Sequence, residues 1–252
     1  RRLVSINLNF SIVIHHDLSL LVYSPWWEEG ILHGMTLRPF SWGSNDSTSN
    51  LSEFYTSTGV TLLANPRQTH GDLCFDARNG AVLAARRAPD GSLARFGEFD
   101  AMIAPLKQNL LNERVAFAIA TADCVPVVMR GVLGWGLVHA GWRGLANGII
   151  GNVARTLGAI REVAIFGCAG GATYEVGREV INAIGDSAVY HETAANKILL
   201  DTAETAKKQL LPYVSAEHIE TSGICTILDT RFHSHRRDGV SAGRAITFVS
   251  PP

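Results

Sequence analysis

Residues 115–144 read VAFAIATADCVPVVMRGVLGWGLVHAGWRG. Three apolar runs, at 115–120, 125–129 and 135–139, have the length of buried strands and are bounded by polar or glycine-containing turns. The segment that follows, Gly144–Gly158, shows the periodicity of an amphipathic helix. This part of the chain therefore predicts three strands in succession and then a helix.

The rest of the chain alternates between the two kinds of element. Strands are predicted in the first forty residues, between 60 and 105, and at Val163–Phe166, Ile219–Gly223 and Ala245–Val249. Helices are predicted at Arg178–Ile184 and at Ala203–Leu211, the second capped by Asp201 or Thr202.

Two regions carry turn signals. Residues 41–50 are polar and predict a loop, after which Asn50 and Glu53 resemble an N-cap and its capping-box partner, starting a short helix that ends at Gly59. Asn79-Gly80 and Pro89-Asp90-Gly91 indicate tight hairpin turns. Because hairpins exclude a purely parallel sheet, we expect an α+β fold, with layered mixed β-sheets and flanking helices in a single domain over residues 1–252.

Composition excludes several classes of protein. The 252 residues carry 22 basic and 23 acidic side chains, without the dense basic stretch of a nucleic-acid groove, and no apolar run reaches the roughly 20 residues of a membrane helix. The four cysteines, Cys74, Cys124, Cys168 and Cys225, are too few and too scattered for a disulfide framework. No secretory signal is visible, so we expect a reducing, cytoplasmic compartment and no nucleic-acid or membrane partner.

Three segments carry residues with reactive or ligating side chains. They are Gln68-Thr69-His70-Gly71, Thr121-Ala122-Asp123-Cys124 and His139-Ala140-Gly141-Trp142-Arg143-Gly144, each at the end or the entry of a predicted strand. Arg143 lies at a helix N-terminus, where amide groups and a guanidinium suit an anion. Taken singly, each segment also fits a structural role: a buried small thiol, a satisfied histidine, or a strand–helix turn.

Taken together, the three segments resemble the signatures of the laccase-domain family, also called the polyphenol-oxidase or YfiH-like family. That family includes the bacterial peptidoglycan-editing factor and purine nucleoside phosphorylases. Further matches follow in the same order along residues 60–250: Glu98-Phe99-Asp100-Ala101, Tyr174-Glu175-Val176-Gly177, Leu200-Asp201, Gly223-Ile224-Cys225-Thr226 and Phe232–Arg244. The sequence departs from the family at Phe166–Thr173, which lacks the usual prolines and predicts a less restrained loop, and at His235, where tyrosine is common.

The resemblance implies a zinc ion, rather than copper, held by His70, Cys124 and His139 with a fourth position open. It implies phosphorolysis of adenosine, inosine, guanosine or methylthioadenosine, and hydrolytic deamination of adenosine, so that the partners are a purine nucleoside and phosphate. For the anion pocket this resemblance suggests Arg143 first and Arg236 or Arg237 second, and Gln68 would hydrogen-bond the substrate. Phosphorolysis needs such a pocket, whereas a metal-bound water is sufficient to attack a purine carbon.

Other interpretations stay open. His233 and His235 are expected to share one face of a strand, but a multicopper polyphenol oxidase needs several such pairs for about four coppers. Cys124 beside His139 would also suit a cysteine hydrolase without metal. The remaining alternatives are hydrolytic editing of peptidoglycan precursors and a non-catalytic structural metal or redox-sensitive thiol site, which a fourth protein ligand would close.

Overall fold

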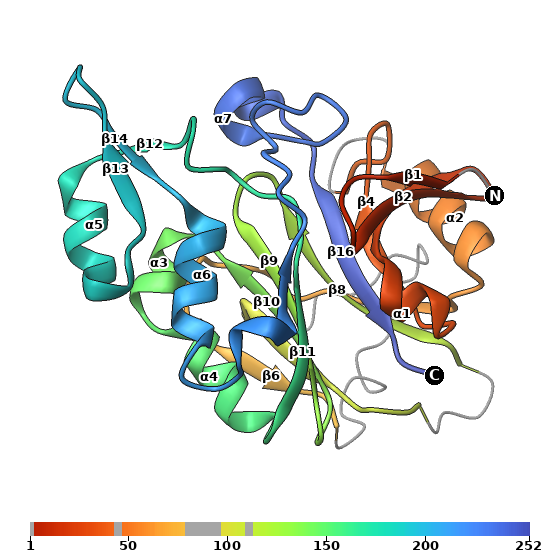
Figure 1. The fold of residues 1–252 in the computed structure, drawn as a ribbon. Coiled ribbons are helices and arrows are strands. Elements are labelled where there is room, and N and C mark those ends of the chain that lie inside the picture. Colours follow the sequence, from red (N-terminus) through yellow and green to blue (C-terminus); the bar gives the residue numbers. More distant parts are fainter. Residues whose placement is uncertain (1–2, 43–46, 79–96, 109–112) are drawn as a thin grey trace.

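Two large β-sheets packed face to face form the centre of the protein (Figure 1). The computed structural model describes residues 3–42, 47–78, 97–108 and 113–252. The seven-stranded sheet has the order β1 (Leu3–Ser5), β2 (Phe10–His15), β3 (Leu18–Tyr23), β4 (Leu32–Thr36), β16 (Ala245–Ser250), β8 (Val115–Thr121) and β5 (Leu62–Ala64). The six-stranded sheet has the order β15 (Ile219–Thr221), β11 (Ile160–Ile165), β9 (Val125–Gly131), β10 (Trp135–Ala140), β7 (Ala101–Ala104) and β6 (Cys74–Asp76).

Both sheets are mixed. The pairs β5–β8, β6–β7 and β11–β15 are parallel, and the other described pairs in these sheets are antiparallel. A small third sheet has the order β12 (Glu175–Val176), β14 (Ile198–Leu200) and β13 (Tyr190–Glu192), and it projects from one end of the molecule in Figure 1.

Helices cover the outer faces of the two large sheets (Figure 1). Against the six-stranded sheet lie α3 (Trp142–Ala146), α4 (Ile149–Thr156), α5 (Arg178–Ile184) and α6 (Thr202–Leu210), and against the other lies α2 (Ser47–Thr58). The short helices are α1 (Ser24–Glu28) and α7 (His235–Asp238), with 3-10 turns at Gly185–Ser187, Ala216–His218 and Gly239–Ser241. Within the described ranges, no helix has the length and apolar character needed to cross a membrane.

Strand β8 shows why the sequence reads as an unbroken apolar run. Its odd-numbered side chains, such as Phe117, lie in the core between the sheets, whereas Ala116 and Ala118 lie in the core under α2. Successive side chains of a strand point to opposite faces, so a strand buried on both sides needs apolar residues at every position. The ends of such strands are the places where polar side chains reach a cavity.

The expected α+β fold of layered mixed sheets with flanking helices is confirmed, whereas a single domain over residues 1–252 stays a prediction. The predicted helix Gly144–Gly158 is wrong as one element, because Gly148, with a φ of 78°, separates α3 from α4. Helix α2 begins at Ser47, so Asn50 lies inside it and is not its cap. The cap of α6 is Asp201, whose carboxylate accepts the N–H of Glu204 at 2.9 Å. The two hairpin turns, at 79–80 and 89–91, lie outside the described residues.

Candidate metal centre and cavity

His70, Cys124 and His139 converge at one end of the six-stranded sheet. One ligand atom from each residue lies within 4.8 Å of those of the other two, and the imidazole centroids of His70 and His139 are 4.9 Å apart. His139 is the next-to-last residue of β10, Cys124 lies in the turn between β8 and β9, and His70 lies in the loop after β5. The convergence therefore depends on the pairing of strands that are distant in sequence.

The backbone around this cluster adopts unusual conformations. His70 and Asp123 have φ values of 61° and 88°, in the left-handed region that non-glycine residues rarely occupy. Such conformations persist where the surrounding structure holds them in place, which is common at functional sites. Gly141 lies so close to the cluster that a Cβ there would be 3.1 Å from Sγ of Cys124 and 3.1 Å from Cδ2 of His70. The site thus uses this glycine for close approach.

A buried carboxylate, Asp100, connects the two histidines. Its Oδ1 accepts a hydrogen bond from Nδ1 of His139 at 2.8 Å, and its carboxylate also accepts the backbone N–H groups of Thr69, His70 and Gly71 at 3.1, 3.0 and 2.7 Å. The first contact fixes the tautomer of His139 and leaves its Nε2 for a ligand, and the others fix the loop that carries His70. The sequence did not single out Asp100 as functional; its only signal was the Glu98-Phe99-Asp100-Ala101 resemblance.

Electrostatics prepare the cluster for a cation. Burial would raise the pKa of Cys124, but the charge of His139 and hydrogen bonds from His139 and His70 lower it to about 6. Burial would likewise lower the pKa of His139, but the Cys124 thiolate and Asp100 raise it to about 9. Burial would raise the pKa of Asp100, yet His139 and the N–H groups of Gly71 and Thr69 lower it to about 2. Without a metal these shifts favour a thiolate beside an imidazolium, and a bound metal ion would displace the imidazolium proton.

The donor set fits a divalent metal. Two imidazole nitrogens and one thiolate sulfur are ligands that zinc accepts, and three protein ligands leave a position for water or substrate. Across the described ranges, this is the one group of three or more His, Cys, Asp or Glu side chains close enough to hold an ion.

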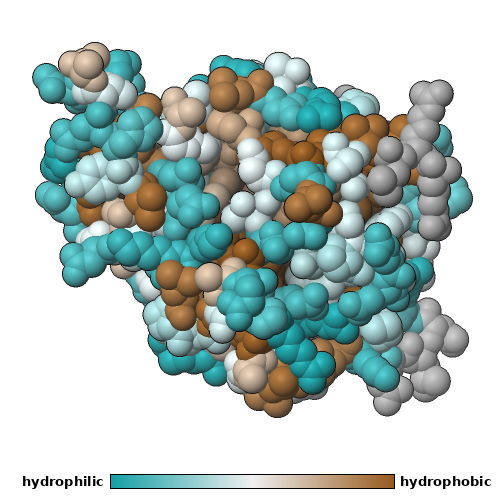
Figure 2. Space-filling model, viewed as in Figure 1, coloured by the Kyte–Doolittle hydropathy of each residue, from teal (hydrophilic) through white to brown (hydrophobic). Residues whose placement is uncertain are grey.

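The cluster borders a cavity of about 1090 Å³. Charged and aromatic residues form much of its wall: Arg38, Trp42, Asp123, Trp142, Arg143, Tyr174, His233, His235, Arg236, Asp238 and Arg244. On the face drawn in Figure 2, hydrophilic and hydrophobic residues are interspersed outside the grey atoms. The arginines give the cavity the means to bind an anion beside the metal cluster.

Two of the residues predicted for substrate line this cavity. The side-chain amide of Gln68 donates to the carbonyl of Ala120 at 2.8 Å and accepts the N–H of Ala120 at 2.7 Å, so it joins its loop to the end of β8. Arg143 is exposed at the start of α3, with its guanidinium 4.3 Å from the ring centroid of Trp142. Arg143 is thus available to a ligand, while Gln68 is engaged by backbone.

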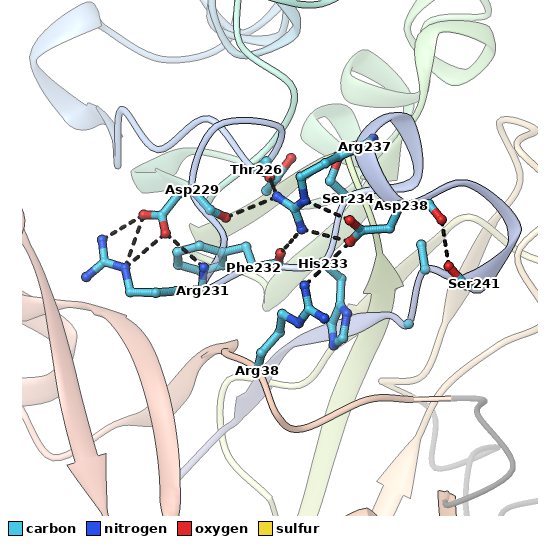
Figure 3. Close-up of polar contacts among 12 residues, drawn as sticks. Arg38, Thr226, Asp229, Arg231, Phe232, His233, Ser234, Arg237, Asp238 and Ser241 are labelled. Carbon is cyan, nitrogen blue, oxygen red and sulfur yellow. Dashed lines mark hydrogen bonds and ion pairs between the residues drawn. The ribbon is translucent and has the colours of Figure 1, made fainter.

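Arg237, the third predicted residue, is not brought to the cavity. Its guanidinium donates to the carbonyls of Thr226 and Phe232, both at 2.7 Å, and forms two 2.8 Å contacts with Asp238 (Figure 3). These contacts hold the segment 226–238 together. Its neighbour Arg236, the other candidate in this pair, lines the cavity.

His233 and His235 do not share one face of a strand, so that prediction is wrong. Ser234 caps α7 through a hydrogen bond from the N–H of Arg237 at 3.1 Å, and His235 is the first residue of the helix. Both histidines nevertheless line the cavity, where Nε2 of His233 lies 2.7 Å from the carbonyl oxygen of Phe40.

The loop Phe166–Thr173 is held despite the missing prolines. The N–H of Ala169 donates to the carbonyl of Asp123 at 2.9 Å, and the hydroxyl of Thr202 donates to the carbonyl of Ala169 at 2.8 Å. The backbones of Cys168 and Cys225 also pair in an isolated parallel β-bridge, without a disulfide bond. Backbone contacts to three neighbouring segments therefore replace the restraint that prolines would give.

Fold and site together define a protein of two packed mixed sheets with three residues that could hold a metal ion at the end of their strands. The family model described as multi-copper polyphenol oxidoreductase laccase matches residues 44–251, and the chain belongs to this family. The crystal structure of the Bacillus licheniformis hypothetical protein YfiH has a TM-score of 0.80 at 22% identity, covering 98% of this chain and 100% of that chain. YlmD from Geobacillus stearothermophilus has a TM-score of 0.73 at 25% identity, covering 88% and 92%.

Several relatives are named purine nucleoside phosphorylase. One from Xylella fastidiosa is 40% identical over 147 residues, which are 52% of this chain and 55% of that protein. One from Aquifex aeolicus is 35% identical over 148 residues, 56% of this chain and 66% of that protein. A third, from Clostridium acetobutylicum, is 26% identical over 225 residues, 81% and 82% of the two chains. The match thus spans little more than half the length of the Xylella relative.

Proposed function

We propose that this chain is a zinc-dependent purine nucleoside phosphorylase that also deaminates adenosine, acting in the cytoplasm on purine nucleosides and phosphate. The observation that carries the proposal is the convergence of His70, Cys124 and His139 within 4.8 Å beside a cavity of about 1090 Å³. The relatives named purine nucleoside phosphorylase support the choice of substrate. The four cysteines, all free thiols in the structure, agree with a reducing compartment.

The chemistry divides between the metal and the chain. Zinc, when bound, supplies a Lewis acid that lowers the pKa of a bound water toward about 7. Asp100 and the backbone of 69–71 keep both histidines oriented while substrate enters. Sulfur and imidazole ligands with an open position are typical of catalytic rather than structural sites.

Phosphorolysis needs an anion subsite as well. In that reaction a phosphate oxygen bonds to the anomeric carbon of ribose as the glycosidic C–N bond breaks and the purine leaves. Arg143 and Arg236 both line the cavity and can each present a planar pair of N–H donors to phosphate. Deamination needs only water oxygen at the purine carbon and departure of ammonia, so the two activities would depend differently on these arginines.

The competing functions are weaker on specific grounds. An oxidase with about four coppers needs several ligand clusters, and the part of the chain described here holds one, of three residues. A cysteine hydrolase built on Cys124 and His139 would leave His70 without a role. A structural metal site would be closed by a fourth protein ligand, which the described residues do not provide.

Metal analysis and product analysis test the proposal together. Purified protein is assayed for zinc and copper and then given adenosine with and without phosphate. Phosphate-dependent release of adenine establishes phosphorolysis, and release of inosine with ammonia establishes deamination. Zinc-loaded protein that forms neither product would overturn both activities, and assays with peptidoglycan precursors or phenols would then decide between the remaining enzymes.

Variants of the ligands sharpen this test. Cys124→Ala and His139→Ala should each lose the metal and the turnover while the circular dichroism spectrum is retained. Cys74→Ala is the matched control, because Cys74 is a half-buried free thiol outside the cluster. Full turnover by metal-free Cys124→Ala protein would falsify the zinc mechanism.

A further inference from the structure

Asp123 joins the metal cluster to two loops of the cavity wall. Its Oδ1 accepts the hydroxyl of Thr226 at 2.7 Å, its Oδ2 accepts the N–H of Arg236 at 2.6 Å, and its carbonyl accepts the N–H of Ala169 at 2.9 Å. Its side chain is buried, and the next residue is the metal ligand Cys124. One residue thus contacts two segments, 166–173 and 226–238, that are distant from it in sequence.

These contacts are made with the backbone of Asp123 in an energetically unfavourable conformation. Its φ of 88° lies in the left-handed region, which costs energy for a residue with a Cβ, although aspartate and asparagine tolerate it better than most. The hydrogen bonds from Thr226 and Arg236 help to hold the turn between β8 and β9 in this conformation.

Arg236 is the side chain that this arrangement places over the cavity. Its guanidinium carbon lies 4.8 Å from the ring centroid of Tyr174, and its NH1 donates to the carbonyl of Glu175 at 2.9 Å. A guanidinium has five N–H donors, so donors remain for an oxyanion. The side chain is exposed at the cavity, whereas that of Arg237 is turned into the 226–238 segment.

We propose that Asp123 is a positioning residue that sets Arg236, as one of the phosphate-binding side chains, at a fixed place relative to Cys124. This inference rests on the proposed function, since it requires phosphate as a substrate. In this role Asp123 acts on the substrate only through Arg236, and both of its carboxylate oxygens accept hydrogen bonds from the protein. Its effect on the reaction passes through the backbone N–H of Arg236.

The test is a kinetic comparison of Asp123→Asn with Arg236→Gln. Asparagine tolerates the same φ but cannot accept both hydrogen bonds, because one carboxylate oxygen becomes an NH2 donor. Losing one hydrogen bond to a charged group should raise the KM for phosphate about tenfold, while kcat changes by less than about twofold. Asp186→Asn, at an exposed acid outside the cavity, is the matched control and leaves the KM unchanged.

The double variant separates positioning from an independent role. Because Asp123 acts through Arg236, the KM for phosphate in Asp123→Asn/Arg236→Gln should equal that in Arg236→Gln alone. Effects that multiply would overturn the inference, as would a fall in kcat at unchanged KM. If the wild-type enzyme shows no phosphorolysis, the proposed function and this inference both fail. If the wild-type enzyme is active but the effects on KM multiply, or kcat falls at unchanged KM, the inference alone fails.

A second variant keeps the test valid if Asp123→Asn does not fold. Thr226→Val removes only the hydroxyl that donates to Oδ1, and its side chain has nearly the same shape in a fully buried position. It should raise the KM for phosphate in the same direction by a smaller factor, with zinc content per chain unchanged. A KM equal to that of the wild type would count against the role of Asp123.

Discussion

Nδ1 of His139 donates a 2.8 Å hydrogen bond to Oδ1 of Asp100, and both side chains are buried. Asp100 accepts in addition the N–H of His70 at 3.0 Å, so the same carboxylate orients one candidate metal ligand by its ring and another by its backbone. Outer partners of this kind fix the tautomer of a ligating histidine and increase its basicity. We therefore expect the metal affinity of the site to depend on Asp100, which is not one of the three candidate ligands.

Asp100→Asn should weaken zinc binding about tenfold to a hundredfold. The amide keeps the shape of the carboxylate but loses its charge. It also places an NH2 group where a carboxylate oxygen accepted hydrogen bonds from N–H groups. Competition with a chromophoric chelator measures the affinity, and Asp186→Asn, an exposed acid, is the control. Equal zinc affinity in Asp100→Asn and wild-type protein would show that the hydrogen bond from Nδ1 of His139 to Asp100 does not affect metal binding.

Removal of the metal should expose a reactive thiol. In metal-free protein the neighbouring His139 and His70 outweigh burial and lower the pKa of Cys124 to about 6, so the thiolate predominates at neutral pH. Iodoacetamide should then alkylate Cys124 rapidly, and added zinc should protect it. Cys168 is the internal control, because burial raises its pKa to about 12.

The readout is peptide mass spectrometry of the modified cysteines. His139→Ala should slow the alkylation of metal-free protein at pH 7, since it removes the charge that lowers the pKa of Cys124. Zinc that leaves the alkylation rate of Cys124 unchanged would mean that this thiol is not a ligand.

The convergence of His70, Cys124 and His139 could be predicted because the three segments that carry them together resemble one family, whereas their spacing alone indicates no metal site. Asp100 was missed because its role exists only after folding: its partners His70 and His139 are 30 and 39 residues away. The sequence named Arg236 or Arg237 for the anion pocket, and it is Arg236 that lines the cavity, for a similar reason. Which of two neighbouring arginines faces the cavity depends on how Ser234 and Asp123 orient α7, and no local pattern records that.

Arg237→Ala should destabilise the fold, whereas Arg143→Ala should weaken phosphate binding. Arg237 donates to the carbonyls of Thr226 and Phe232 and pairs with Asp238, so its loss should lower the free energy of unfolding by about 2 kcal/mol. Arg143 is exposed, and its removal should cost less than about 0.5 kcal/mol.

Urea denaturation and the KM for phosphate distinguish the two arginines. The expected pattern is a lower urea midpoint for Arg237→Ala with a KM near the wild-type value, and a higher KM for Arg143→Ala with an unchanged midpoint. A higher KM for phosphate in Arg237→Ala with an unchanged urea midpoint, and a lower midpoint with an unchanged KM in Arg143→Ala, would place Arg237 in the anion subsite instead.

A fully buried histidine far from the metal cluster should make the protein sensitive to acid. Burial lowers the pKa of His33 to about 4, and its Nε2 already accepts the N–H of Tyr23 at 3.0 Å while Nδ1 donates to the carbonyl of Ile31 at 2.9 Å. Between an unfolded pKa of about 6.5 and the folded value, the unfolded chain binds more protons, so stability rises with pH in this window. The contribution of neutral His33 to the free energy of unfolding is complete above pH about 6.5. It is lost as the pH falls toward 4, at about 1.4 kcal/mol per pH unit and about 3 kcal/mol in all.

Urea titrations at pH 7, 5.5 and 4.5 should show that the free energy of unfolding falls more steeply toward acid pH for wild-type protein than for His33→Gln, with the exposed His191→Gln as control. Parallel declines in all three proteins would show that His33 becomes protonated in the folded state without cost.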